Sequence, residues 1–322
     1  MNPAPVMRFT KSVLPISQKT QRTSAPRPSC PINHPPLPIP MSLFHALLLG
    51  LIQGLTEFIP VSSTAHLLIG QTLLGLPASD AMFSFLVIIQ WGTLVSLFAF
   101  YWSDLLNIAR AVLAFLPCLV QRRDPSTSLR QSLTPETLLG LYILLATVPA
   151  LLAGYLLKDA VEALFRQPLL QAATRLFAAA ILLTLAENLS KKNRTLETMT
   201  WLDALIIGLF QILAVFPGAS RSGTTISGGM FRGLDRPSAA RFAFLMSVPV
   251  MLAAGAYELL DVAQLPNLTD FLLPLAVGFV SAAVSGWLAI RWLITYLTKR
   301  SLHVFATYCA IVGITSLTIH LL

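Results

Sequence analysis

Apolar residues in this chain fall into runs whose lengths follow the same order twice, two short runs and then three long ones. In the first half the runs are 42–56 and 63–76, then 83–102, 136–157 and 170–188. In the second half they are 203–216 and 223–234, then 238–260, 271–297 and 303–322. A helix needs about 20 apolar residues to cross a bilayer. The long runs therefore predict transmembrane helices, and each short pair predicts a re-entrant helical hairpin.

The composition supports an all-α polytopic membrane protein. The chain is 55% hydrophobic and 11% charged, with a mean hydropathy of +0.72, whereas soluble domains carry about 25% charged residues. The net charge of +8 does not indicate a nucleic-acid partner, because five basic residues lie in the first forty positions and most others lie in loops between apolar runs. The three cysteines, Cys30, Cys118 and Cys309, have neither disulfide nor metal-site spacing.

The order of the runs predicts two repeats, 41–190 and 200–322, within a single membrane domain, 41–322. Because each repeat has an odd number of spans, the second should have inverted topology relative to the first. Short segments at matching positions of two halves are typical of a binding site near the bilayer midplane. We therefore expect the two hairpins to enter from opposite faces and meet near the middle of the membrane.

Basic residues predict the orientation. Twelve fall on one side of the predicted topology and two, Lys158 and Arg166, on the other; the twelve are Arg110, Arg122, Arg123, Arg130, Lys191, Lys192, Arg194, Arg232, Arg236, Arg241, Lys299 and Arg300. By the positive-inside rule the basic side is cytoplasmic. The first hairpin, and a site built on it, would then open to the outer side, where both Ser42 and Leu322 are expected.

Residues 1–40 form a separate segment, rich in proline and lacking Asp and Glu, and they are predicted to be a disordered extension. A transit-like segment is one interpretation. The other is a mis-assigned start, with Met41 as the true first residue. We expect that deleting the segment leaves folding and activity intact.

The first hairpin carries a dense polar group between its apolar flanks, consisting of Gln53, Glu57, Ser62, Ser63, Thr64 and His66 around Pro60. Gln53 and Glu57 lie on one helix face. An intramembrane carboxylate is costly unless it is paired, binds a cation or faces water. Glu57 is therefore either a metal ligand or general base, or one half of a structural ion pair.

Ser63 and His66 are three residues apart, so the imidazole could reach the hydroxyl, as in a base that activates a nucleophile. Capping of the second half-helix by Ser62 or Ser63 is the structural alternative for the serines. A packed core residue is the alternative for His66.

The second hairpin offers Ser220, Arg221, Ser222, Gly223 and Thr225 at the start of its second half-helix. Amide donors at a helix N-terminus and a guanidinium can together bind a phosphate. The alternative is that Arg221 simply pairs with Glu57, and both can hold in the unliganded protein. Arg175 and Glu187 lie near the ends of apolar runs, where snorkelling to the membrane surface is expected.

Two stretches, Gln53–His66 and Pro217–Gly229, resemble the paired signatures of the undecaprenyl-diphosphatase family, the bacitracin-resistance phosphatases, and the resemblance covers about 41–322. It implies a bacterial inner-membrane enzyme that hydrolyses undecaprenyl diphosphate to undecaprenyl phosphate, the lipid carrier of peptidoglycan synthesis. It further implies that activity requires a divalent cation, Mg or Ca. The chain could act as a monomer or as a homodimer.

Carried over by position, the resemblance implies catalytic roles for Glu57, Ser63, His66 and Arg221, with Glu57 also the metal ligand. Its substrate-binding positions are Gln53, Ser62, Thr64, Ser220, Ser222, Gly223 and Thr225. Gln53 departs from the usual acidic residue, which weakens a two-carboxylate metal site.

Two rival functions remain at the level of sequence. A transporter or flippase for a lipid phosphate or an organic anion would suit inverted repeats equally well, but it would not need the Glu57, Ser63 and His66 chemistry. A structural scaffold would leave the intramembrane Glu57 and Arg221 unexplained.

Overall fold

A computed structural model describes residues 41–322 except 78, 121–132, 158–167, 215–218 and 263–267. The prediction for residues 1–40 lies outside this part. From Ile39 to Leu322 the chain forms one compact unit. The regular structure in the described ranges is helical, apart from one isolated bridge between Arg194 and Leu234. The all-α prediction is confirmed.

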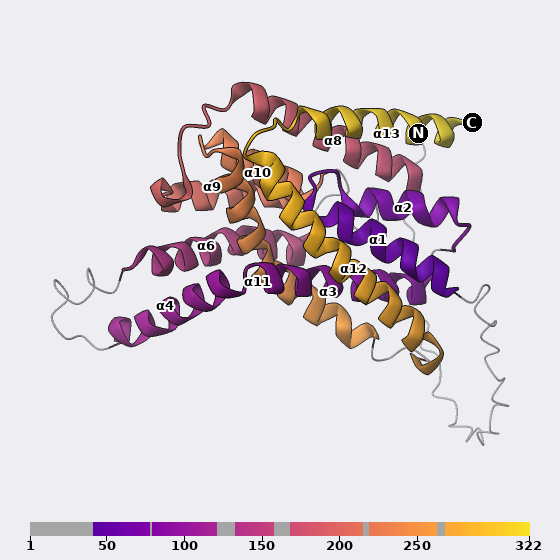
Figure 1. The fold of residues 1–322 in the computed structure, drawn as a ribbon, viewed down its shortest axis with the longest axis horizontal. Helices are drawn as coiled ribbons and strands as arrows, with labels where there is room; N and C mark the ends of the chain where they lie inside the picture. Colours follow the sequence, from indigo (N-terminus) through magenta and orange to yellow (C-terminus); the bar gives the residue numbers. More distant parts are fainter. Residues whose placement is uncertain (1–40, 78, 121–132, 158–167, 215–218, 263–267) are drawn as a thin grey trace, which may run out of the picture. The chain divides into compact units, whose positions relative to one another are not determined.

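The helices follow the predicted order (Figure 1). The first half contains α1 (Leu43–Phe58), α2 (Ser63–Leu73), α3 (Asp80–Phe100), α4 (Trp102–Val120), α6 (Pro135–Leu156) and α8 (Pro168–Leu189). The short η1 (Leu196–Thr198) leads to α9 (Trp201–Ile212), α10 (Arg221–Phe231), α11 (Arg236–Val262), α12 (Leu268–Leu297) and α13 (His303–Leu321).

Among the described residues, five helices are long and apolar enough to cross a membrane, namely α3, α6, α8, α12 and α13. The chain is a polytopic membrane protein. The sixth predicted span, 238–260, coincides with α11, whose 27 residues include side chains near the C-terminal end that lie outside the described part. The paired short helices α1 and α2, and α9 and α10, occupy the positions predicted for the two hairpins.

Helix α4 was not predicted. Its 19 residues fall in the segment between the first two long runs, where Asp104 and Arg110 interrupt the apolar pattern. The helix is amphipathic, because Ile108 and Val112 are one turn apart and both press on Gly140 of α6. Residues 111–120 are apolar on every face, but the polar side chains of the first half leave this run too short to predict a transmembrane helix.

Each hairpin packs against a long helix of the other half. Helix α1 lies along α12, and α9 lies along α6 (Figure 1). The glycines that begin the two Gly-Leu-x-Gln motifs make these contacts possible. A Cβ on Gly50 would overlap the carbonyl oxygen of Gly278, and one on Gly208 would overlap that of Ala146. The halves are therefore interlocked. In each half, the first glycine of the motif packs against a long helix of the other half, Gly50 against α12 and Gly208 against α6.

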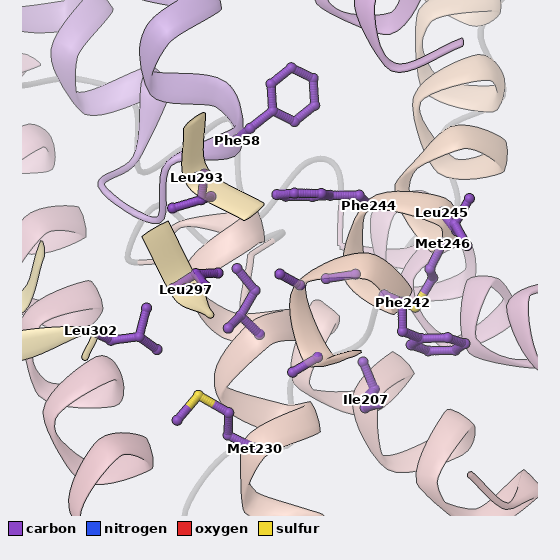
Figure 2. Close-up of a cluster of buried hydrophobic side chains, with 14 of the residues drawn as sticks. Phe58, Ile207, Met230, Phe242, Phe244, Leu245, Met246, Leu293, Leu297 and Leu302 are labelled. Atoms are coloured by element: carbon purple, nitrogen blue, oxygen red, sulfur yellow. The ribbon is translucent and has the colours of Figure 1, made fainter. Parts of the chain in front are cut away.

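The apolar core holds the hairpins in place (Figure 2). Phe58, the last residue of α1, meets Phe244 of α11 edge-on, with ring centroids 5.5 Å apart. Ile207 of α9 and Met230 of α10 are fully buried in the same cluster. Phe58 thus anchors the end of α1 that carries Glu57, and Ile207 and Met230 anchor the two helices of the second hairpin.

Buried ion pairs join loops to helix ends away from the hairpin tips. The carboxylate of Asp203 is fully buried and accepts hydrogen bonds from Arg194 and Arg232. Glu187 is buried and pairs with Arg236 and with Lys192. The snorkelling predicted for Glu187 is wrong, since its charge is neutralised inside the protein and its side chain does not reach the surface. Arg175 is also buried, which contradicts the same prediction there.

Candidate functional site

The tips of the two hairpins touch each other. The Ser222 hydroxyl of α10 donates to the carbonyl oxygen of Ile59, just after α1, at 3.4 Å. A Cβ on Gly223 would lie 3.8 Å from the carbonyl oxygen of Pro60. The polar motifs therefore form one cluster, although Ile59 and Ser222 are 163 positions apart in the sequence.

Glu57 is at the centre of this cluster. Its Oε2 atom accepts hydrogen bonds from the Gln53 amide at 3.0 Å and from the Ser63 hydroxyl at 2.6 Å. Its Oε1 atom forms an ion pair with the guanidinium of Arg221, which comes from the other hairpin. The Glu57 side chain is 6% exposed and that of Arg221 is 21% exposed. The Glu57 carboxylate is thus shielded from solvent, whereas part of the Arg221 side chain remains accessible to solvent.

The hydrogen bond between Ser63 and Glu57 corrects the sequence-based pairing of Ser63 with His66. The Nδ1 atom of His66 lies 2.8 Å from the carbonyl oxygen of Ser62, and its Nε2 atom lies 2.8 Å from the hydroxyl of Tyr308. Both ring nitrogens therefore have other partners. The i, i+3 spacing put the two side chains on one helix face, but it could not show that a carboxylate of the preceding helix lies closer to the hydroxyl.

Ser62 has an unusual backbone conformation. Its φ of 69° lies in the left-handed region, which a residue with a Cβ occupies at a cost of about 1–3 kcal/mol. Its side chain makes no capping hydrogen bond, so the predicted capping role is wrong for Ser62. The strained turn instead directs the Ser62 carbonyl oxygen at His66. Thr64, in the first turn of α2, is exposed.

The second hairpin presents a helix start, as predicted. The Ser220 hydroxyl caps α10 by accepting from the Gly223 amide at 3.2 Å, and it lies 3.2 Å from the Ser222 hydroxyl. Thr225 donates its hydroxyl to the carbonyl oxygen of Arg221 within the helix. The N-terminus of α10 and the guanidinium of Arg221 are therefore next to Glu57. The turn that contains Pro217 lies outside the described residues.

The donor set is compatible with a divalent cation only in part. Mg²⁺ is commonly bound by one or two carboxylates together with substrate phosphates and water. The cluster supplies one carboxylate, Glu57, and neutral oxygen atoms from Gln53 and Ser63. The described residues contain no group of three His, Cys, Asp or Glu side chains that could hold a metal by itself. A cation here would need oxygen atoms from the substrate as further ligands.

Comparison with known proteins shows the family to which this cluster belongs. A family model described as "Bacitracin resistance protein BacA" matches residues 46–315. The chain belongs to the BacA family. Curated relatives named undecaprenyl-diphosphatase extend the match. One from Anaeromyxobacter dehalogenans is 46% identical over 270 residues, which cover 83% of this chain and 88% of the relative.

Two more distant relatives carry the same name. The protein from Synechocystis is 40% identical, covering 87% of this chain and 83% of its own, and the protein from Methanobrevibacter smithii is 38% identical, covering 85% and 96%. The family resemblance proposed from the two motifs is confirmed. The BacA match runs from the first turn of α1 through the second hairpin to most of α13, so every residue of the candidate site lies inside it.

Sequence reasoning did not identify one residue of this cluster, Tyr308. It lies 242 residues from His66 and comes from α13, yet its ring stacks on the imidazole with centroids 5.6 Å apart and planes 5° apart. Its neighbour Cys309 is buried, with its Sγ atom 3.9 Å from the carbonyl oxygen of Pro60. Helix α13 thus contacts the first hairpin at its turn. A tyrosine in an apolar run gave no signal for this contact.

Proposed function

We propose that this BacA-family protein hydrolyses undecaprenyl diphosphate to undecaprenyl phosphate and inorganic phosphate, as the names of its relatives suggest. The observation that carries the proposal is the junction of the hairpins. Glu57 holds the Ser63 hydroxyl at one oxygen atom and Arg221 at the other. A candidate nucleophile, Ser63, and a phosphate-binding guanidinium, that of Arg221, therefore both contact the candidate base, Glu57.

Each group has a role in the proposed reaction. Arg221 and the amide groups at the start of α10 bind the terminal phosphate, because a guanidinium forms paired hydrogen bonds with phosphate oxygen atoms. As Arg221 turns to the substrate, its ion pair with Glu57 opens, which leaves the carboxylate free to accept the Ser63 proton. The Ser63 oxygen then attacks the terminal phosphorus while its proton passes to Glu57.

The bond from that phosphorus to the bridging oxygen breaks, and undecaprenyl phosphate leaves. Attack of water on the resulting phosphoserine releases inorganic phosphate and regenerates Ser63. His66 is close to the turn that carries Ser63, and it is suited to give or take a proton at its Nε2 atom. Gln53 orients Glu57 through the 3.0 Å hydrogen bond. Ser62, Thr64, Ser220, Ser222, Gly223 and Thr225 are proposed to shape the phosphate site.

A divalent cation, Mg or Ca, is part of the proposal. As the alternative to taking the Ser63 proton, Glu57 would hold the cation together with phosphate oxygen atoms, and the cation would neutralise charge on the diphosphate. The single carboxylate agrees with a cation that is bound mainly when substrate is present. We expect phosphate release to stop on addition of a chelator and to resume when the cation is restored.

The proposed setting is the bacterial inner membrane, with the inverted-topology repeats bringing the hairpins together from opposite faces and the site open to the outer side. The exchange of partners between halves, α1 with α12 and α9 with α6, supports the repeat. The twelve-to-two distribution of basic residues supports the orientation. The proposed partners are membrane lipids, the polyprenyl diphosphate and, in a homodimer, a second copy of the chain.

Phosphate release from a prenyl diphosphate by the purified protein in detergent tests the proposal. A phosphatase releases one phosphate per diphosphate, with Mg²⁺ or Ca²⁺ present. The contrary result is saturable binding of the diphosphate, or its movement across a vesicle membrane, with no phosphate released. That result would favour the transporter function, against which the family names of the relatives already weigh.

A further inference from the structure

The hydrogen bonds of His66 determine which of its nitrogens carries a proton. A carbonyl oxygen only accepts, so the contact between Nδ1 and the Ser62 carbonyl at 2.8 Å requires a proton on Nδ1. In the neutral ring Nε2 is then the acceptor, and the Tyr308 hydroxyl donates to it at 2.8 Å. The nitrogen that is available for proton transfer is therefore the one that faces Tyr308.

A hydroxyl suits this position in both protonation states of the ring. It can donate to Nε2 when His66 is neutral and accept from Nε2–H when His66 is charged. The two rings are also nearly parallel, with planes 5° apart and centroids 5.6 Å apart, so the ring of Tyr308 contacts the imidazole as well as its hydroxyl does. A group that exchanges protons during turnover can thus keep one orientation throughout.

We propose that Tyr308 is a positioning residue for the reaction, which keeps the Nε2 atom of His66 oriented through each change of its protonation. Helix α13 brings Tyr308 to this place, since the adjacent Cys309 is buried against the Pro60 carbonyl at the hairpin turn. The inference rests on the phosphatase function proposed above. It assigns to the last helix of the second half a part in the chemistry of the first hairpin.

The Tyr308→Phe variant tests this role because it removes only the hydroxyl and keeps the stacked ring. The Tyr308 side chain is 43% exposed, so the change leaves no buried cavity. Loss of one such hydrogen bond should lower kcat about tenfold and leave KM for a prenyl diphosphate within about twofold. Tyr155→Phe, the same change on an 84% exposed ring of α6, is the matched control and should change neither constant.

A double-mutant cycle shows whether Tyr308 acts through His66. In a His66→Asn background, which retains a polar side chain, adding Tyr308→Phe should cause no further loss, because the partner of the hydroxyl is already gone. A second tenfold loss in that background would overturn the proposal. So would normal kcat in Tyr308→Phe alone.

A measurement that needs no turnover separates this inference from the function it rests on. In protein labelled with ¹⁵N at histidine, the His66 ring should show a protonated Nδ1 and an unprotonated Nε2, and the Nε2 signal should move on Tyr308→Phe and stay unchanged on Tyr155→Phe. An Nε2 signal indifferent to Tyr308→Phe would refute the contact. If the wild-type protein releases no phosphate while the Nε2 signal responds, the proposed function fails and the contact stands.

Discussion

Replacing Glu57 by glutamine should separate catalysis from stability. The substitution keeps the size of the side chain, but only one of its two terminal atoms remains an acceptor. If the amide nitrogen takes the place of Oε1, it faces the donors of Arg221; if it takes the place of Oε2, it faces the amide of Gln53 and the hydroxyl of Ser63. Either orientation therefore mismatches at least one contact and removes the negative charge.

The cost to stability follows from burial. Breaking a fully buried ion pair costs about 3–5 kcal/mol, and an exposed pair about 0.2–1 kcal/mol. Glu57 is buried but the Arg221 side chain is 21% exposed, so water can solvate the unpaired guanidinium. We expect a loss of about 1–2 kcal/mol. Turnover should fall by a much larger factor, about 10²–10⁴, because a general base is lost.

The assay is phosphate release from a prenyl diphosphate, with thermal unfolding of the same purified samples in detergent. Glu187→Gln is the matched control, since Glu187 is also a buried, ion-paired glutamate, but it pairs with Arg236 and Lys192 outside the cluster. That variant should lose at least as much stability and keep its kcat per folded molecule. Near-normal turnover in Glu57→Gln, or an equal kcat loss in Glu187→Gln, would refute the assignment of Glu57.

Three further outcomes are expected. Gly208→Ala should lower Tm in detergent by an amount equivalent to about 1–3 kcal/mol, because its methyl group meets the backbone of α6, whereas Gly154→Ala, with nothing within 4 Å, should not; equal Tm values would contradict the close packing. Burial raises the pKa of Asp203, but hydrogen bonds from two arginines and from Thr200 outweigh this and lower it overall. The ionised Asp203 carboxylate therefore contributes its full stabilisation above the unfolded pKa of about 3.9, and this contribution is lost as pH falls towards the lower folded value. Asp203→Asn should reduce Tm at pH 7 and make the fall of Tm below about pH 4 shallower; the same fall of Tm in variant and wild type would contradict this role of Asp203. Arg221→Lys should cut turnover about 10²-fold, since a point charge does not replace the guanidinium fork, and wild-type rates in this variant would exclude the phosphate-binding role.

The hairpins could be predicted from sequence because their signals are local. Pro60 and the apolar length limits place the ends of α1 and α2 within a few residues of those observed. The pairing of Glu57 with Arg221 was one of two alternatives derived from the same motifs, since opposite charges at membrane depth have few other partners.

The remaining features depend on contacts that no local pattern encodes. Helix α4 was missed because Asp104, Asn107 and Arg110 interrupt its first half, which leaves an apolar run of about ten residues, too short to predict a span. The Ser63 hydroxyl bonds Glu57 of the preceding helix and not His66, and the spacing of residues within α2 contains no information about that neighbouring helix. Tyr308 meets His66 across 242 residues of sequence, through the packing of α13 beside α8.

The proposed chemistry is tested most directly by product analysis after a single turnover of undecaprenyl diphosphate, with diphosphate binding measured on the same samples. Wild-type protein should convert each bound diphosphate to undecaprenyl phosphate and one inorganic phosphate. Ser63→Ala should bind the diphosphate with a similar Kd and form neither product. Product formation by Ser63→Ala at the wild-type rate, or intact diphosphate recovered from the wild-type protein, would contradict a site in which Ser63, Glu57 and Arg221 act together.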